Sequence, residues 1–316
     1  MEVNSFMEWR KSELKKIIFM LMVLIAGTVH GENITYKKNK KILTSIQAVY
    51  SIAKSLTKDT DIEVYSIFDS DVSMDYGKSA FDNKDLDLSS AKDAVAVVDV
   101  ARVWGNDYLY EYARRKNIRI VEIDASYSFS GNDYLSLSLL NYKNGDRNPY
   151  VWMSFQNVIK MANIAADDLS ELFPEDSKRI EDNLINFSQE IKEIENGYLE
   201  KTLDLSSLSV ITLTENLDYL FNDLNIFFNY VDSNELTVEK ISEVMKRNNS
   251  KIFVSDRWIK KEIINEIEKK GGKFLVLDNF NIPRELNEKM DPDGYIKGMK
   301  ENMEKLVEVM KFMDKK

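Results

Sequence analysis

The 316-residue chain contains no cysteine and only one histidine, His30. Zinc and similar metals favour thiolate and imidazole ligands, so a conventional zinc site lacks its usual donors here. Nucleophilic catalysis by a cysteine and histidine pair needs the same groups, and a serine, histidine and aspartate triad needs an available histidine. No disulfide can form either, so the fold has to be stabilised by packing alone.

Glycine and proline are also scarce, with 11 and 4 residues respectively. No segment matches the glycine-rich phosphate-binding patterns GxGxxG or GxxxxGK[ST]. Neighbouring carboxylates such as Asp85 and Asp87 leave a glycosidase-type pair open as an alternative. Most of these carboxylates must be solvated in so acidic a chain, and we therefore expect a protein that is not an enzyme.

The charge balance is acidic, with 53 Asp and Glu against 43 Lys and Arg and a formal net charge of −10. An acidic surface repels nucleic acids and anionic membranes, so neither is an expected partner. Hydrophobic residues make up 44% and charged residues 30%, the balance of an ordinary folded chain. Because 316 residues exceed what one core usually holds, we expect two compact lobes.

Near the N-terminus, a basic segment precedes an unbroken apolar run, Ile17–Gly27, and a polar segment begins at Glu32. This order is typical of a signal peptide, predicted over residues 1–31 with cleavage near Gly31. The run is shorter than the roughly 20 residues of a transmembrane helix, although an uncleaved anchor stays open as an alternative. Export would place the protein in the periplasm or outside the cell and would remove His30. No cysteine follows the run, so the protein is not expected to be a lipoprotein.

Beyond the predicted signal peptide, short runs rich in β-branched and aromatic residues alternate with amphipathic helical runs. Such alternation is typical of βα units that form a parallel sheet. Between the two alternating halves, residues 154–203 carry no strand pattern and predict two helices separated at Pro174. The predicted strands are 41–46, 61–68, 94–100, 118–124, 208–214, 226–231, 251–256 and 273–278.

These patterns predict an α/β fold with two Rossmann-like lobes, each with a parallel sheet, joined by one long spanning helix. The predicted boundaries are 32–176 for the N-terminal lobe, 177–203 for the helix and 204–316 for the C-terminal lobe. A coiled coil is the alternative for the long helix, but its apolar spacing is irregular. Because a continuous helix has no hinge loop, we expect little relative motion of the lobes.

Two segments of the sequence, together with the predicted order of lobe, helix and lobe, resemble a known family. The stretch NPYVWMS, Asn148–Ser154, is similar to the family motif Asp/Asn-Pro-His-x-Trp-Met/Leu-Ser/Asp-Pro, and FPEDSKRIEDNLINF, Phe173–Phe187, follows it as the family requires. The family is that of the zinc and manganese receptors of ABC importers, whose two Rossmann-like lobes are bridged by one rigid helix. The resemblance covers nearly the whole chain after the predicted signal peptide. Tyr150 stands where the family has a metal-binding histidine.

The resemblance also implies positions for the other metal ligands. Met74, with Asp75 beside it, falls in the loop that carries the family's first ligand. Thr214 has the strict spacing of the third ligand, and Glu215 follows it. Asp278 ends a late strand, as the fourth ligand does. The implied metal ligands are therefore Met74, Asp75, Tyr150, Glu215 and Asp278, and the implied cleft walls are Trp152, Thr214 and Asp256.

Several of these residues have a purely structural alternative. Tyr150 and Trp152 can pack together as an aromatic pair, as aromatic side chains often do when buried. Met74 can fill a gap in the core, because methionine adapts to irregular spaces. Asp256 can pair with Arg257 at the surface.

The implied donors form an oxygen-rich site that suits Mn²⁺ or Fe³⁺ better than Zn²⁺, so the expected cargo is a divalent or ferric metal ion. A phenol titrates near pH 10, and coordination through Tyr150 would need a strongly polarising ion such as Fe³⁺. One alternative is a metal complex or another small solute between aromatic walls formed by Tyr150, Trp152 and Trp104.

The resemblance implies an exported solute-binding receptor that acts as a monomer and passes its cargo to an ABC permease in the inner membrane. A second class of function is an enzyme on the same scaffold, because a fold does not fix a function. A third is an adhesin or scaffold that uses the fold without a metal.

Overall fold

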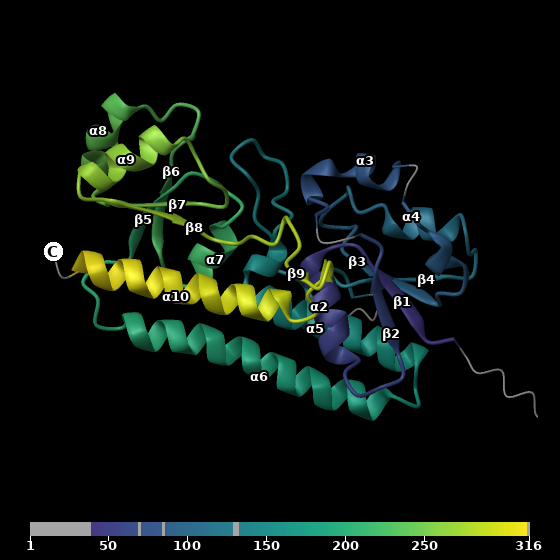
Figure 1. Ribbon diagram of the computed structural model, residues 1–316. Coiled ribbons are helices and arrows are strands. Elements are labelled where there is room, and N and C mark those ends of the chain that lie inside the picture. Colours follow the sequence, from purple (N-terminus) through teal and green to yellow (C-terminus); the bar gives the residue numbers. More distant parts are fainter. Residues whose placement is uncertain (1–38, 69–70, 84–85, 129–132, 315–316) are drawn as a thin grey trace, which may run out of the picture. The chain divides into compact units, whose positions relative to one another are not determined.

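The computed structural model describes residues 39–68, 71–83, 86–128 and 133–314 (Figure 1). The predicted signal peptide and His30 lie outside these residues. Within the described ranges, no helix has both the length and the apolar composition needed to cross a membrane.

The first lobe is built on a four-stranded parallel sheet with the order β2-β1-β3-β4. Strand β3 is buried along its whole length, because helices cover it on both faces. The register pairs Leu43 of β1 with Tyr65 of β2 and with Val97 of β3. The strands are β1 Lys41–Thr44, β2 Glu63–Ser66, β3 Ala96–Asp99 and β4 Val121–Asp124, and the helices are α2 Gln47–Leu56, α3 Lys78–Phe81 and α4 Leu109–Arg114.

The second lobe repeats the same strand order, β6-β5-β7-β8, again with all strands parallel. A short antiparallel pair, β9 Glu285–Leu286 with β10 Lys289–Met290, follows it. Each of the eight predicted strands contains one observed strand of these two sheets, so the predicted fold class is confirmed. The strands are β5 Ser209–Thr212, β6 Phe227–Tyr230, β7 Ile252–Ser255 and β8 Lys273–Val276, and the helices are α7 Asp218–Asp223, α8 Ile241–Asn248 and α9 Lys261–Lys269.

Long helices pack beneath both sheets (Figure 1). Helix α5, Phe155–Leu172, begins where the side chain of Ser154 accepts a hydrogen bond from the backbone N–H of Asn157. Helix α6, Ser177–Thr202, is the predicted spanning helix. Helix α10, Gly294–Asp314, runs beside α6, a position that the sequence analysis did not predict. A second long helix therefore packs along the predicted spanning helix.

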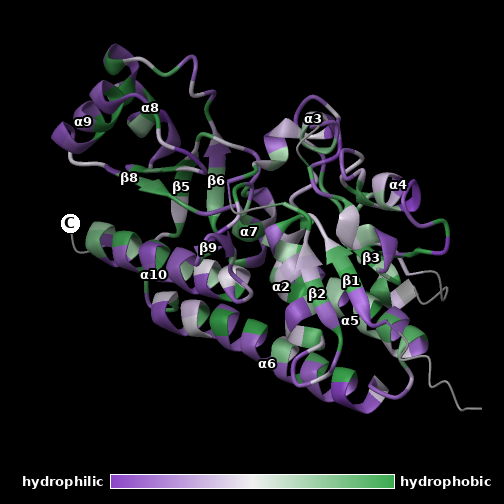
Figure 2. Ribbon diagram, turned by 45° about the vertical axis from the view of Figure 1, so that its right-hand side comes forward, coloured by the Kyte–Doolittle hydropathy of each residue, from purple (hydrophilic) through white to green (hydrophobic). Residues whose placement is uncertain are grey.

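The core is continuous between the lobes because these helices contribute buried side chains to it. On α6 the fully or nearly buried residues recur every three, four or seven positions, so they share one apolar face (Figure 2). Full burial of such a side chain contributes roughly 1.5–3 kcal/mol relative to exposure. The buried apolar residues of this face are Ile180, Phe187, Ile191, Ile194 and Tyr198.

Candidate functional site

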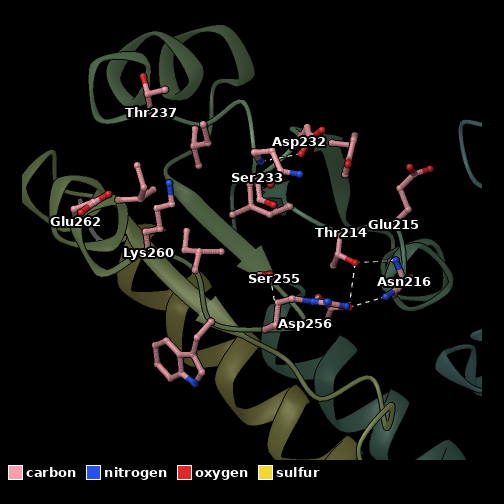
Figure 3. Close-up of a pocket in the computed structure, with 18 of the residues that line it drawn as sticks. Thr214, Glu215, Asn216, Asp232, Ser233, Thr237, Ser255, Asp256, Lys260 and Glu262 are labelled. Atoms are coloured by element: carbon pink, nitrogen blue, oxygen red, sulfur yellow. Dashed lines mark hydrogen bonds and ion pairs between the residues drawn. The ribbon is translucent and has the colours of Figure 1, made fainter. Parts of the chain in front are cut away.

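The candidate site lies at the carboxyl edge of the second sheet. In a sheet of this order, the chain leaves β5 and β7 in opposite directions, and open α/β sheets bind ligands at such a point. Thr214 and Asn216 follow β5, and Asp256 follows β7. A pocket of about 930 Å³ opens here, with these three residues on one side of it (Figure 3).

Asp256 is the centre of a hydrogen-bond network in this pocket, and its side chain is only 2% exposed. Its Oδ2 accepts from Asn216 Nδ2 at 2.6 Å, from Asn279 Nδ2 at 2.9 Å and from Thr214 Oγ1 at 3.2 Å. Its Oδ1 accepts from Arg257 Nε at 3.1 Å. An ionised carboxylate only accepts hydrogen bonds, so this set of donors matches the charged form of Asp256.

A segment of the first lobe, residues 138–148, crosses to the second lobe and borders the pocket; we call it the strap. The Tyr219 hydroxyl accepts from Leu140 N at 2.8 Å and donates to the carbonyl oxygen of Asn148 at 3.0 Å. Glu215 Oε2 accepts from Lys143 N at 2.6 Å, and the Glu215 carbonyl accepts from Asn148 Nδ2 at 2.8 Å. Glu215, a predicted metal ligand, therefore binds the strap in this structure.

Tyr150 follows the strap and is almost fully buried, with 5% of its surface exposed. Its ring packs edge-on against Trp152, with the ring centroids 5.4 Å apart, and Trp152 Nε1 donates to the carbonyl oxygen of Asn279 at 3.0 Å. Burial raises the pKa of the Tyr150 phenol, and the nearby charges of Asp75 and Asp256 raise it further. The phenol is thus neutral at physiological pH, and only a strongly polarising ion could bind it as phenolate.

Met74 and Asp75 belong to a short 3-10 helix, η1 Met74–Tyr76. The Met74 N–H donates to the carbonyl oxygen of Asn281 at 2.9 Å, and its side chain is buried in the core. Asp75 Oδ2 accepts from Asn281 Nδ2 at 3.0 Å. The loop that follows β8 in the second lobe therefore holds this loop of the first lobe in place.

Asp278 faces a different direction from the pocket network. Its carboxylate accepts from Phe280 N at 2.8 Å and pairs with Arg284 Nη1 at 3.4 Å, and its backbone bonds Asn302 of α10. The next residue, Asn279, is the one that reaches Asp256. The side chains of these two successive residues thus have different partners, Arg284 for Asp278 and Asp256 for Asn279.

The structure brings some of the predicted site residues together and separates others. Asp75, Tyr150 and Asp256 interact electrostatically, Thr214 bonds Asp256, and Asp278 makes its contacts elsewhere. Within the described residues, no three His, Cys, Asp or Glu side chains converge so that they could hold a metal ion. The metal-binding roles stay predictions. Asn216, Asn279 and the strap residues could not be predicted from the sequence, because amides and loop residues carry no motif of their own.

The family model described as ZnuA, the periplasmic component A of the zinc-uptake complex, matches residues 42–309. A comparison with curated protein sequences finds no match.

Solved structures of similar fold include FpvC from Pseudomonas aeruginosa in complex with Mn²⁺, at 17% identity and a TM-score of 0.67, covering 87% of this chain and 100% of that one. The Zn(II)-bound ZnuA-like domain of AdcA from Streptococcus pneumoniae matches at 18% identity and a TM-score of 0.65, covering 86% and 99%. A crystal structure of ZnuA matches at 17% identity with a TM-score of 0.65, covering 85% of this chain and 98% of that one. At these identities the likeness shows the fold alone.

Proposed function

The chain belongs to the ZnuA family of periplasmic zinc-uptake components, and from this premise we propose that it is an exported receptor for a metal ion or metal complex. It binds this cargo between its lobes and passes it to an ABC permease in the inner membrane. The family match over residues 42–309 is the observation that carries the proposal. The role is binding and delivery by a monomer, without catalysis.

The cargo contacts side chains from both lobes. Asp75 supplies a carboxylate and Tyr150 a neutral phenol oxygen from the first lobe, and Asp256 supplies a carboxylate from the second. Glu215 lies at the edge of this group. Its hydrogen bond to the strap must break before its carboxylate can bind the cargo. A phenol and carboxylates favour hard cations such as Mn²⁺ or Fe³⁺ over Zn²⁺.

Native mass spectrometry with elemental analysis, on protein purified without chelators, tests the proposed function. We expect a metal-containing species that survives desalting in the wild type. The double variant Asp75→Ala and Asp256→Ala should lose it, because both carboxylates of the cleft are removed. The single variant Asp278→Asn serves as the control and should retain it. A wild-type protein that carries no metal, even after incubation with Mn²⁺, Fe³⁺ and their complexes, would contradict the proposal.

A further inference from the structure

Arg257 places a fixed positive charge in the pocket. It directly follows Asp256, to which its Nε donates, and its backbone N–H donates to Ser255 Oγ at 3.3 Å. The side chain is 61% exposed and lines the pocket. In the part of the chain that the structure describes, its Nε pairs with Asp256 and its two terminal nitrogens have no hydrogen-bond partner. They are therefore available to a ligand in the pocket.

The guanidinium covers the side of Asp256 that a metal ion would need. Oδ2 already receives three donors, from Thr214, Asn216 and Asn279, which leaves it no free lone pair. Oδ1 faces the Arg257 Nε. A cation that approaches this carboxylate finds only the second lone pair of Oδ1 free, beside the positive guanidinium that repels it.

Arg257 also interacts with the first lobe. Its own pKa is raised by the hydrogen bond to Asp256 first and by the charge of Asp75 in addition. The same guanidinium opposes the rise in the pKa of Tyr150. The positive charge thus lies within electrostatic reach of the carboxylates of both lobes and of the phenol, which are the groups proposed to contact the cargo.

We propose that Arg257 is a resident cation that occupies the place of a metal ion beside Asp256, so that the cleft disfavours bare divalent cations. The cargo is then a metal complex whose own ligands are anionic. This inference rests on the proposed function of the cleft. The terminal nitrogens of an arginine match carboxylate groups in a two-pronged geometry. The pocket of about 930 Å³ has room for an organic chelator, far beyond the need of a bare ion.

The substitution Arg257→Gln tests this by titration calorimetry with Mn²⁺ alone. We expect at least tenfold tighter Mn²⁺ binding than in the wild type, because the competing charge is gone while Asp256 keeps its other donors. Arg257→Lys should stay close to the wild type, since it retains the charge. Lys260→Gln removes a positive charge from the exposed rim of the same pocket, away from Asp256, and should change the affinity less than twofold. Equal or weaker Mn²⁺ binding by Arg257→Gln would overturn the proposal.

A second titration uses the anionic complex of Mn²⁺ with nitrilotriacetate. The wild type should bind this complex more tightly than bare Mn²⁺, and Arg257→Gln should reverse the order. If the wild type prefers the bare ion, and Arg257→Gln binds it no better, Arg257 is not a resident cation and the receptor function still stands. If neither protein binds either form, both the inference and the proposed metal-receptor function fail.

Discussion

The side-chain amide of Asn279 donates a hydrogen bond of 2.9 Å to the carboxylate of Asp256. The two residues follow adjacent strands of the second sheet, β8 and β7, and Asp256 lines the pocket. Asp278, one position earlier, pairs with Arg284 instead. Because Asn279 rather than Asp278 points toward Asp256, the carboxylate that we propose to contact the cargo is that of Asp256.

Substitution of the two aspartates should separate their roles. Asp256→Asn removes the charge that holds Arg257 and places an amide against the donors of Asn216 and Asn279, so we expect at least a tenfold loss of bound metal complex. Asp278→Asn should keep cargo binding within about twofold and cost about 0–1 kcal/mol of stability, because its ion pair is partly exposed. Calorimetry and thermal unfolding measure both effects. Loss of cargo binding in Asp278→Asn alone would restore the ligand role that the sequence implied.

Two tyrosines offer a matched pair for substitution by phenylalanine. Among the described residues, the Tyr150 hydroxyl makes no hydrogen bond, whereas the Tyr219 hydroxyl makes two. Tyr150→Phe should change the free energy of unfolding by less than about 0.5 kcal/mol, and Tyr219→Phe should cost about 1–3 kcal/mol because the strap loses its partner.

The same Tyr150 substitution reports on metal coordination. Because burial raises the pKa of its phenol, we expect no visible charge-transfer band when Fe³⁺ is added to the wild type. A band that appears with Fe³⁺ and disappears in Tyr150→Phe would show that the phenolate binds the ion after all.

A group of buried carboxylates in the first lobe should make stability depend on pH. Burial raises the pKa of Asp107 to about 7, although the Ser45 hydroxyl donates to it at 2.9 Å. Burial and the neighbouring Asp107 and Asp124 raise the pKa of Asp99 as well, and both Asp99 oxygens are buried without a partner among the described residues. Burial also raises the pKa of Asp218 in the second lobe to about 7. A pKa above the unfolded value means that the stability is present at low pH and is lost as the pH rises through about 7.

Thermal unfolding at several pH values tests whether stability falls as the pH rises. The melting temperature should fall between pH 6 and pH 8, with a loss on the order of a few kcal/mol. Asp218→Asn should reduce this slope and raise stability at pH 8 by about 1 kcal/mol, because a largely buried charge is removed. The control is Asp93→Asn. The hydrogen bond to Lys41 lowers the pKa of Asp93, so this substitution should leave the change in melting temperature between pH 6 and pH 8 as in the wild type. A flat wild-type profile from pH 6 to pH 8 would contradict the prediction.

The lobes should move little when cargo binds. Helices α6 and α10 are continuous, and the strap bonds the second lobe through Glu215 and Tyr219. None of these connections is a hinge loop. Small-angle scattering with and without a bound metal complex should give nearly the same radius of gyration, and a large compaction would show that the lobes close.

Local patterns in the sequence determined the order of the strands and helices. Runs such as Ala94–Val100 and Ile118–Asp124 predicted β3 and β4 because they are short and rich in β-branched residues, which are enriched in strands. The stretch Asn148–Ser154 also predicted the family, because all residues of the motif are consecutive and can be read without knowledge of the fold.

Only the tertiary structure decided which side chains meet. Asn279 rather than Asp278 reaches Asp256, because the orientation of each residue after β8 depends on contacts with α10 and with Trp152, far away in the chain. The position of α10 beside α6 likewise depends on packing between distant apolar faces. A sequence pattern records the preference of a short segment, but the direction of a side chain at a strand end is set by long-range contacts that no short segment contains.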